Sequence, residues 1–322
     1  MDFGSRDAQP LKFGIVLPTY RRLASAGNIL RAAALTETLG FDSVWVSDHV
    51  VVPSRNIDSF GPTFFEAVTV MAYVAGVTDR VAIGAAILIV PYRHPLLLAK
   101  MLTTIDQLSR GRVILGAGLG WLEDESRLLG VPHRERAAIT DETLAVLRTC
   151  WGSDEPRFRG KIFELDGFHF SPRPYGDRRI PIFIGGATTA ALRRVARLGD
   201  GWIGDGQTFE ELEVSLAQLG RELAAAGRHV DEVEIAMRAS LQVVADTVEI
   251  TDSPSEKGWK SEEFAGAGRT PFRGLRHEVV ADIRRAAAMG VAHLILEFPI
   301  SKGEESMDLF AVLAEMRDEA GV

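Results

Sequence analysis

Two periodicities of apolar residues alternate along the chain. Short runs rich in β-branched and aromatic residues predict buried strands, and apolar residues spaced three or four positions apart predict amphipathic helices. The predicted strands are residues 12–18, 42–48, 80–90, 112–118, 180–186, 201–206, 232–244 and 292–298. The predicted helices are residues 28–39, 63–76, 97–108, 140–151, 188–199, 208–227, 277–289 and 304–318. Each strand is followed by a helix, which predicts a closed (β/α)₈ TIM barrel, an α/β fold, that spans residues 1–322 as a single domain.

Two segments interrupt this alternation. Residues 156–174 hold turn residues between short alternating runs, which predicts a hairpin inserted before the fifth strand. Residues 245–275 are rich in Thr, Ser, Gly, Lys and Glu, and they predict a long loop after the seventh strand, over the C-terminal mouth of the barrel. Thr140 is the predicted N-cap of the helix at 140–151.

An open, doubly wound sheet with a dinucleotide site is the competing fold. The sequence GAGLGW at 116–121 directly follows a predicted strand, as a dinucleotide fingerprint would. That fingerprint requires glycine where the chain has Trp121, and no strand ending in an acid follows at the expected distance of about 20 residues. These glycines therefore indicate a tight turn at a strand end that lets a planar ligand approach the backbone.

Composition narrows the class of protein. The 322 residues are 46% hydrophobic and 25% charged, which is typical of a globular protein. The longest apolar run, residues 81–90, is shorter than the roughly 20 residues of a membrane-spanning helix, and we expect a cytoplasmic protein without membrane contact. The net charge of −8 argues against nucleic-acid binding. The single cysteine, Cys150, lies in an apolar helical pattern and predicts a buried structural thiol.

The second predicted strand ends in a titratable pair, Asp48 and His49. The C-terminal ends of barrel strands carry the chemistry of this fold, and an imidazole there can donate or accept a proton near neutral pH. The alternative is a buried pair that only stabilises the strand end. No metal site is predicted, because the seven histidines lack helical HxxxH spacing and no carboxylate cluster accompanies them.

A glycine pair ends the fifth predicted strand. Gly185, Gly186, Ala187 and Thr188 join that strand to a helix, so backbone N–H groups, a hydroxyl and the positive end of the helix converge there. This arrangement can bind a phosphate. The same residue types also fit a plain turn in which Thr188 or Thr189 is the helix N-cap, and both interpretations stay open.

Four segments in order resemble a known family. Residues 47–53 (SDHVVVP), 91–125, 133–151 and 181–203 together resemble the bacterial luciferase-like monooxygenases, and more closely the deazaflavin branch that uses coenzyme F420 in place of FMN. The resemblance covers residues 12–205 in register and is looser beyond them. It implies a (β/α)₈ barrel, usually a homodimer, that holds the cofactor at its C-terminal mouth.

The resemblance also implies roles for individual residues. His49 matches the active-site histidine beside the reactive ring carbon, with Asp48 as its neighbour. The implied cofactor-binding positions are Gly118, Leu119 and Gly120 in the turn beside the cofactor, Gly185, Gly186, Ala187 and Thr188 around its phosphate, and Ala86 and Ile87, which are joined by a cis peptide that supports the ring.

The chain departs from the family pattern after the fourth strand. Some sugar-phosphate dehydrogenases of the deazaflavin branch have a catalytic glutamate where this chain has Trp121, and Glu123 and Glu125 come further along. This difference argues against a sugar-phosphate substrate, although basic residues after the seventh strand leave the question open. These basic residues are Lys257, Lys260, Arg269 and Arg273. The aromatic residues that either wall a pocket or pack at the barrel rim are Tyr20, Phe60, Tyr92 and Trp121.

Three functions are consistent with these residues. The first is hydride transfer between F420 and a small organic substrate, with His49 supplying or removing the accompanying proton. The second is an FMN-dependent two-component monooxygenase that uses reduced flavin and oxygen. The third is a non-catalytic protein that only binds flavin or deazaflavin, and the Asp48–His49 pair argues against it.

Overall fold

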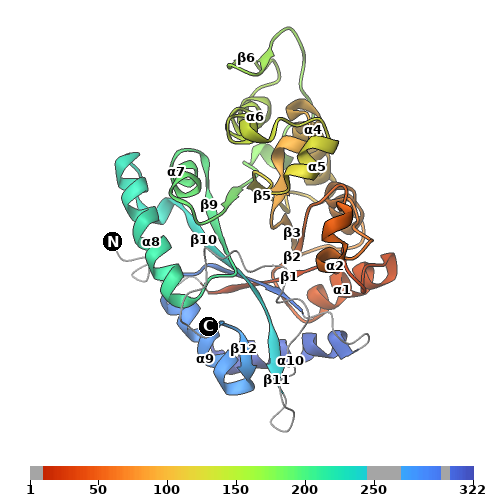
Figure 1. Ribbon diagram of the computed structural model, residues 1–322, viewed down its shortest axis with the longest axis vertical. Helices are drawn as coiled ribbons and strands as arrows, with labels where there is room; N and C mark the ends of the chain where they lie inside the picture. The colour runs from red at the N-terminus through yellow and green to blue at the C-terminus, as the bar shows by residue number, and fades with distance from the viewer. Residues whose placement is uncertain (1–9, 245–269, 299–304) are drawn as a thin grey trace.

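Eight parallel strands close into a barrel in the computed structural model, which describes residues 10–244, 270–298 and 305–322 (Figure 1). The barrel strands are β1 (Lys12–Val16), β2 (Ser43–Val46), β3 (Ala82–Ala85), β5 (Val113–Gly118), β8 (Ile182–Gly185), β9 (Gly201–Asp205), β10 (Glu234–Ser240) and β13 (His293–Glu297). They pair in the order β3-β2-β1-β13-β10-β9-β8-β5, and a further pairing of β3 with β5 closes the ring. The short strand β4 (Leu88–Ile89) continues beside β5. The predicted (β/α)₈ barrel is confirmed.

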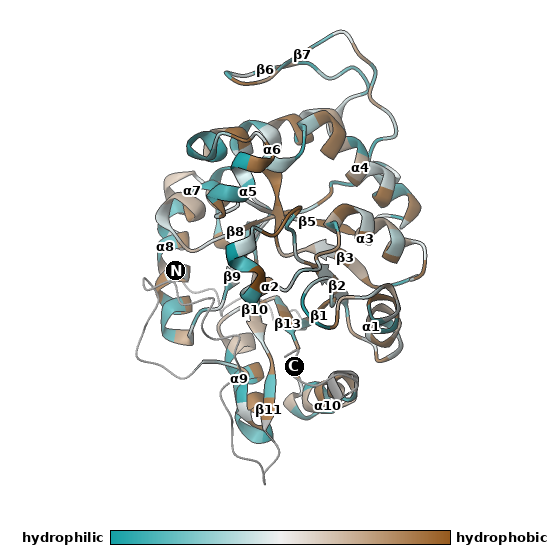
Figure 2. Ribbon diagram, turned by 45° about the vertical axis from the view of Figure 1, so that its right-hand side comes forward, coloured by the Kyte–Doolittle hydropathy of each residue, from teal (hydrophilic) through white to brown (hydrophobic). Residues whose placement is uncertain are grey.

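Helices surround the strands, as Figure 2 shows. Those that follow barrel strands are α1 (Ala26–Thr38), α3 (Ala67–Ala75), α4 (Pro95–Leu108), α6 (Arg136–Gly152), α7 (Thr189–Leu198), α8 (Phe209–Ala225), α9 (Arg276–Ala288) and α10 (Glu305–Ala320). Each overlaps the segment predicted for it. α8 shows why such predictions succeed: Thr208 and Glu211 form a reciprocal capping box at its start.

The helix α6 begins earlier than predicted. Its first residue is Arg136, because a 3₁₀ turn at His133–Glu135 leads directly into it. Thr140 therefore lies inside the helix, where its hydroxyl donates to the carbonyl of Arg136 at 2.8 Å, and the predicted N-cap role is wrong. Cys150, near the other end of α6, is buried as predicted, and burial raises the pKa of its thiol to about 11.

A layer of apolar side chains fills the barrel interior. It comprises Val16, Trp45, Ala86, Ile114, Phe183, Ile203, Ala236 and Ile295. The indole of Trp45 lies over Gly84, where an added Cβ would come within 2.4 Å of the ring, so a glycine is required at that position. This layer lies between the charged groups at the two ends of the barrel strands.

Glu234 stabilises the N-terminal end of the barrel in its ionised form. Its carboxylate is hydrogen-bonded to His293 Nε2 and lies 3.5 Å from Lys12 Nζ. The bond to His293 lowers the pKa of Glu234 from 4.5 to about 2. Because the folded state favours the carboxylate, its stabilisation is fully present above pH 4.5 and is lost as the pH falls to about 2.

We therefore expect the free energies of unfolding of the wild type and of Glu234→Gln to converge between pH 4.5 and about 2. The difference above this range should be about 1 kcal/mol or less, because 42% of the Glu234 side chain is exposed to screening by solvent. Urea unfolding at several pH values measures both proteins. A difference that does not change with pH would contradict the assignment.

The inserted hairpin is also confirmed. β6 (Phe158–Arg159) pairs antiparallel with β7 (Glu164–Leu165), and Figure 2 shows both at the upper edge of the molecule. The turn between them is tied to α6, because the carboxylate of Glu142 accepts from the three backbone N–H groups of residues 161–163 at 2.6, 2.9 and 3.0 Å. The hairpin is thus held against α6, on the outside of the barrel.

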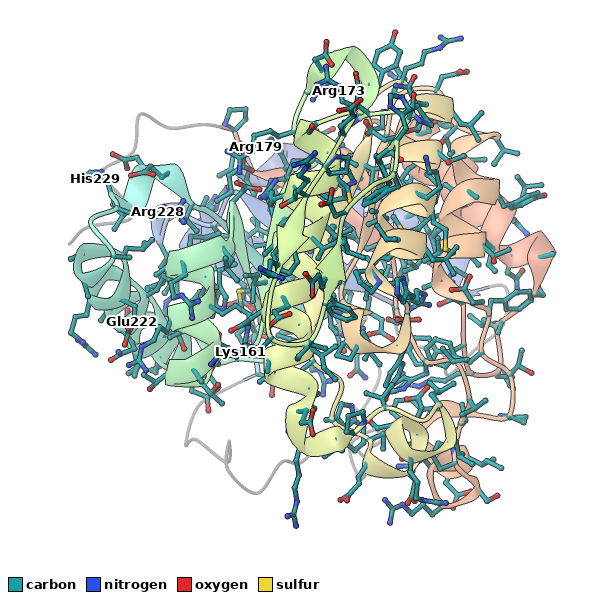
Figure 3. The ribbon with its side chains drawn as sticks, turned by 90° about the horizontal axis from the view of Figure 1, so that it is seen from above. Lys161, Arg173, Arg179, Glu222, Arg228 and His229 are labelled. Atoms are coloured by element: carbon teal, nitrogen blue, oxygen red, sulfur yellow. The ribbon has the colours of Figure 1, made fainter. Side chains whose placement is uncertain are left out.

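Arginine side chains hold α7 in place. Arg228, labelled in Figure 3 beyond the end of α8, donates to three carbonyls within residues 195–199 at the C-terminal end of α7, at 3.3, 3.1 and 2.9 Å. Arg193 of α7 pairs with Glu222 of α8 at 3.1 Å. Cations at the C-terminal end of a helix also interact favourably with its dipole. The N-terminus of α7 is therefore held in a fixed position beside the end of β8.

Only part of the long loop predicted after the seventh strand is described. The end of the predicted seventh strand forms a separate short strand, β11 (Gln242–Val244), which pairs in parallel with β12 (Arg273–Leu275) at the end of the predicted loop. The sequence did not predict β12. The basic residues Lys257, Lys260 and Arg269 lie outside the described residues. Within the described ranges, no helix combines the length and the apolar character needed to cross a membrane.

Candidate active site

His49 lies at the C-terminal end of the barrel, directly after β2, and a buried glutamate fixes its ring. The Nδ1 atom of His49 is 2.6 Å from the Oε2 atom of Glu125. The other carboxylate oxygen of Glu125 accepts from the backbone N–H groups of Val50 and Val51, at 2.7 and 3.2 Å. Glu125 is fully buried, so these donors replace the water that would otherwise solvate its charge.

The partners of Glu125 decide which nitrogen of His49 carries a proton. Backbone N–H groups can only donate, and the hydroxyl of Tyr92 donates to Oε2 at 3.2 Å, so the carboxylate accepts on both oxygens. The hydrogen between His49 and Glu125 therefore belongs to Nδ1, and Nε2 is left to accept a proton. No described residue forms a hydrogen bond with Nε2, and 9% of the His49 side chain is exposed.

The short helix α5 (Glu123–Leu128) brings Glu125 to His49. Its first turn is acidic, and the positive end of a helix stabilises carboxylates there. Asp124 of this turn pairs with Arg55 at 3.0 Å, which ties the segment after β2 to α5. Sequence reasoning noted Glu125 only as a departure from the family pattern. The run of acidic residues 123–125, just after the turn that ends β5, was the sequence signal that could have pointed to a carboxylate in the site.

Asp48 has different partners from His49. Arg93 donates to both carboxylate oxygens of Asp48 at 2.7 and 2.8 Å, and the N–H of Ile89 donates at 2.8 Å. Burial alone would lower the pKa of Arg93, but its hydrogen bonds to Asp48 raise it. Asp48 thus joins the end of β2 to β4 and to the turn that follows. The predicted Asp48–His49 pair is therefore corrected to two separate pairs, and the stabilising interpretation holds for Asp48.

Glycines in the predicted cofactor turns make room for isoleucine side chains. An added Cβ on Gly118 would lie 2.1 Å from Ile87 Cδ1, and one on Gly185 would lie 2.6 Å from Ile87 Cγ2. Gly120, with a φ of +75°, faces Ile89 Cγ2 at 2.7 Å in the same way. The side chains of Ile87 and Ile89 are thus the described groups that approach these glycines most closely, and the approach of a planar ligand stays a prediction.

Ala86, Ile87 and Leu119 lie around these glycines. The Ala86–Ile87 peptide bond is cis, at the position that the family resemblance implies. Ala86 belongs to the interior apolar layer, whereas Ile87 is half-buried. Leu119 is also half-buried and follows the last residue of β5. Ile87 therefore provides an accessible apolar surface between the ends of β5 and β8.

Replacing Gly118 with alanine is expected to displace Ile87. The added methyl group would overlap the Ile87 side chain, and such overpacking costs about 1–3 kcal/mol. Urea unfolding measures this cost. Gly27→Ala is the matched control, because Gly27 lies in α1 and nothing lies within 4 Å of its added Cβ. The control should gain about 0.5–1 kcal/mol from the helix propensity of alanine. Equal stability of the two variants would contradict this packing.

The N-terminus of α7 lies directly after β8. Thr188 is its N-cap, and the Oγ1 atom of Thr188 accepts from the N–H of Ala191 at 3.2 Å. Gly186 has a φ of +110°, which favours glycine, and its carbonyl accepts from Trp202 Nε1 at 2.8 Å. Ala187 is half-buried between them. The capping interpretation of Thr188 is confirmed, and the first N–H groups of the helix still lack an intrahelical acceptor, as an anion site requires.

Charged side chains gather at the ends of β9, β10 and β13. Arg238 donates to Glu297 at 2.7 Å and to Asp205 at 3.2 Å. Arg21 lies 3.5 Å from Glu297, and the hydroxyl of Tyr20 donates to the same carboxylate. Burial raises the pKa of Tyr20. Sequence reasoning missed this cluster. Across the ranges that the structure describes, no group of three or more His, Cys, Asp or Glu side chains is suited to a metal ion.

Aromatic rings surround His49. The centroid of its ring is 4.9 Å from that of Phe60, 5.3 Å from that of Phe64 and 6.4 Å from that of Trp121. Tyr20 stacks on Phe64 with centroids 4.8 Å apart. Trp121 is 51% exposed, whereas Tyr20 and Phe60 are buried. The structure brings Tyr20, Phe60 and Trp121 into one aromatic group with Phe64, whereas Tyr92 donates to Glu125. That these rings wall a substrate pocket stays a prediction.

Comparisons with known proteins agree with this geometry. Residues 11–309 match the family described as luciferase-like monooxygenase. The chain is 31% identical, over 68% of its length, to the FMNH(2)-dependent dimethylsulfone monooxygenase of Pseudomonas fluorescens (strain Pf0-1), and 32% identical, also over 68%, to the F420-dependent glucose-6-phosphate dehydrogenase of Amycolatopsis mediterranei (strain U-32). These matches span 58% and 66% of the two relatives, which is less than two thirds of either.

Among solved structures, the monooxygenase RslO1 from Streptomyces bottropensis has a similar fold. Its TM-score is 0.79 at 25% sequence identity, and the match covers 97% of this chain and 100% of that one. The likeness therefore extends over the whole barrel.

Proposed function

The chain belongs to the luciferase-like monooxygenase family, and from this premise we propose that it is an oxidoreductase that transfers a hydride between coenzyme F420 and a small organic substrate. The observation that carries the proposal is the bond between His49 Nδ1 and Glu125, which leaves His49 Nε2 without a hydrogen-bond partner among the described residues, at the C-terminal end of the barrel. The F420-dependent relative supports the choice of cofactor.

The described residues fit this cofactor. Ile87 offers a half-buried apolar surface, packed closely over Gly118 and Gly185, that suits one face of a flat ring. The first-turn N–H groups of α7 suit a phosphate. We propose that Ala86 and Ile87 support the ring, that residues 118–120 line it, and that residues 185–188 hold the phosphate. When bound, the deazaflavin supplies a ring carbon that accepts or donates a hydride.

His49 moves the proton that accompanies the hydride. When an alcohol is oxidised, its hydroxyl proton passes to Nε2, and Glu125 stabilises the imidazolium through Nδ1. In the reverse direction, the imidazolium returns the proton to the carbonyl oxygen of the substrate. Phe60, Phe64 and Trp121 limit the access of water to the His49 ring, so the proton is exchanged mainly with the substrate.

An FMN-dependent monooxygenase is the second candidate, favoured by the similarity to the dimethylsulfone monooxygenase and to RslO1. Cofactor preference separates the two. Fluorescence titration of the protein with F420 and, separately, with FMN is expected to show at least about tenfold tighter binding of F420. Equal or tighter binding of FMN would favour the second candidate. Tight F420 binding without hydride transfer to or from any alcohol, aldehyde or ketone would indicate a carrier protein.

We also propose a homodimer. The exposed apolar side chains Tyr73, Val77, Leu97 and Leu108 lie on or beside α3 and α4, which pack against each other. Light scattering after size-exclusion chromatography would give twice the monomer mass, and a monomer would refute this assignment. The cytoplasmic location stays a prediction that cell fractionation would check.

A further inference from the structure

We infer that the substrate carries no negative charge and consists of an aromatic or other apolar body with one hydroxyl or carbonyl group. The inference rests on the proposed function and names the substrate class of that same site. Two observations carry it: the aromatic rings around the proposed proton acceptor, and the balance of charges at the strand ends beside them.

The aromatic rings define what can approach His49. Phe60, Phe64 and Trp121 all lie with ring centroids within 6.4 Å of the imidazole centroid. Tyr20 continues this set through its stack on Phe64. A substrate group that reaches Nε2 therefore leaves the rest of the molecule against apolar ring surfaces. Such surfaces favour an apolar or aromatic body, and the two phenylalanine rings offer no donor to a phosphate or carboxylate.

The charged cluster next to these rings is already neutralised. Each of the two guanidinium groups, Arg21 and Arg238, is paired with a carboxylate, and the carboxylates belong to Asp205 and Glu297. An anionic substrate would have to displace one of these carboxylates or bind close to it, and like charges repel. Asp205 adds to this effect, because 35% of its side chain is exposed at the mouth.

Tyr20 connects the two groups of residues. Its ring stacks on Phe64, and its hydroxyl donates to Glu297. One substrate can therefore contact the aromatic rings and the neutralised cluster together. A hydroxyl or carbonyl group, which hydrogen-bonds without a charge, is compatible with both, and it is also the group that exchanges a proton with His49 Nε2.

A pair of probes that differ in charge tests the inference. Isothermal titration calorimetry at neutral pH compares 2-naphthalenemethanol, 2-naphthoate and glucose 6-phosphate on the F420-loaded protein. We expect the neutral alcohol to bind at least about tenfold more tightly than the carboxylate of the same ring, and glucose 6-phosphate to bind more weakly than either. Equal or tighter binding of either anion, or no binding of any probe, would overturn the inference.

Two variants and one control show whether the named residues cause this preference. Trp121→Ala should weaken binding of the alcohol by about tenfold, whereas Leu128→Ala, at an exposed leucine of α5, should leave it unchanged. Asp205→Asn should narrow the difference between the alcohol and 2-naphthoate, which a purely structural role would not do. An unchanged difference would contradict the role of the cluster.

The binding test and the proposed function fail in different ways. Reduction of F420 with glucose 6-phosphate, together with weak binding of the alcohol, would keep the oxidoreductase and remove the substrate class. Tight binding of the alcohol without hydride transfer to F420 from any alcohol tested would remove the proposed function instead.

Discussion

His49→Ala is expected to lower kcat by about 10²- to 10⁴-fold, the usual contribution of a general acid or base. The substitution removes Nε2, which is the proposed proton acceptor, and it leaves Ile87 and the start of α7 unchanged. Cofactor affinity should therefore change by less than about threefold. Steady-state kinetics with a neutral alcohol gives kcat, and fluorescence titration gives the Kd for F420.

His229→Ala is the matched control for this variant. His229 is an exposed histidine after α8 that contacts Asp231 and Glu232 close by in the chain, and Figure 3 labels it far from the barrel centre. Its kcat should equal that of the wild type. If His49→Ala retained wild-type turnover, His49 would have no part in proton transfer, and the proposed mechanism would be wrong.

Glu125→Gln is expected to lower kcat by about 10²- to 10⁴-fold as well, because it places the imidazole proton on the wrong nitrogen. The amide oxygen must accept from the N–H groups of Val50 and Val51, where one carboxylate oxygen accepts now. The amide nitrogen then donates to His49 Nδ1, so a neutral imidazole carries its proton on Nε2 and cannot accept another there. Kinetics of the variant measures this loss.

Glu123→Gln, at an exposed position of the same helix, is the control for the loss of one negative charge. It should keep wild-type kcat. Circular dichroism and the Kd for F420 show whether Glu125→Gln still folds and binds cofactor. Wild-type kcat in a folded Glu125→Gln protein would contradict the role of Glu125 in positioning the proton of His49.

The barrel could be predicted from the sequence because its elements are encoded locally. Buried parallel strands are short apolar runs, and the surrounding helices carry an apolar residue every three or four positions. Boundaries were less certain where a short turn continues directly into a helix, as at His133–Glu135 before α6. The short elements α2 (Ile57–Phe60), α5 and β12 have too few residues to show any periodicity.

The partner of His49 could not be predicted, because the contact joins residues 76 positions apart. Asp48 lies next to His49 in the chain, and adjacency suggested a pair. Successive residues of an extended segment point in different directions, so the neighbours in sequence found partners in α5 and in the turn after β4. A histidine and a glutamate at this separation give no pattern without the fold.

The glycines show a second limit of sequence reasoning. Gly118 and Gly185 indicate that something approaches the backbone closely, but they do not indicate whether it is a ligand or a side chain. In the structure it is Ile87. The cluster around Arg238 was missed for a related reason. Its carboxylates, Asp205 and Glu297, end strands that become neighbours of β10 only when the barrel closes.

A crystal structure of the protein soaked with F420 tests the central claim most directly. The claim is that one flat cofactor lies on Ile87, with its phosphate at the start of α7 and its reactive carbon beside His49. The predicted result is ring density in contact with Ile87. His49 Nε2 should then face the space above the reactive ring carbon, where the substrate would bind. Cofactor bound elsewhere, or a His49 ring turned away from it, would contradict the account.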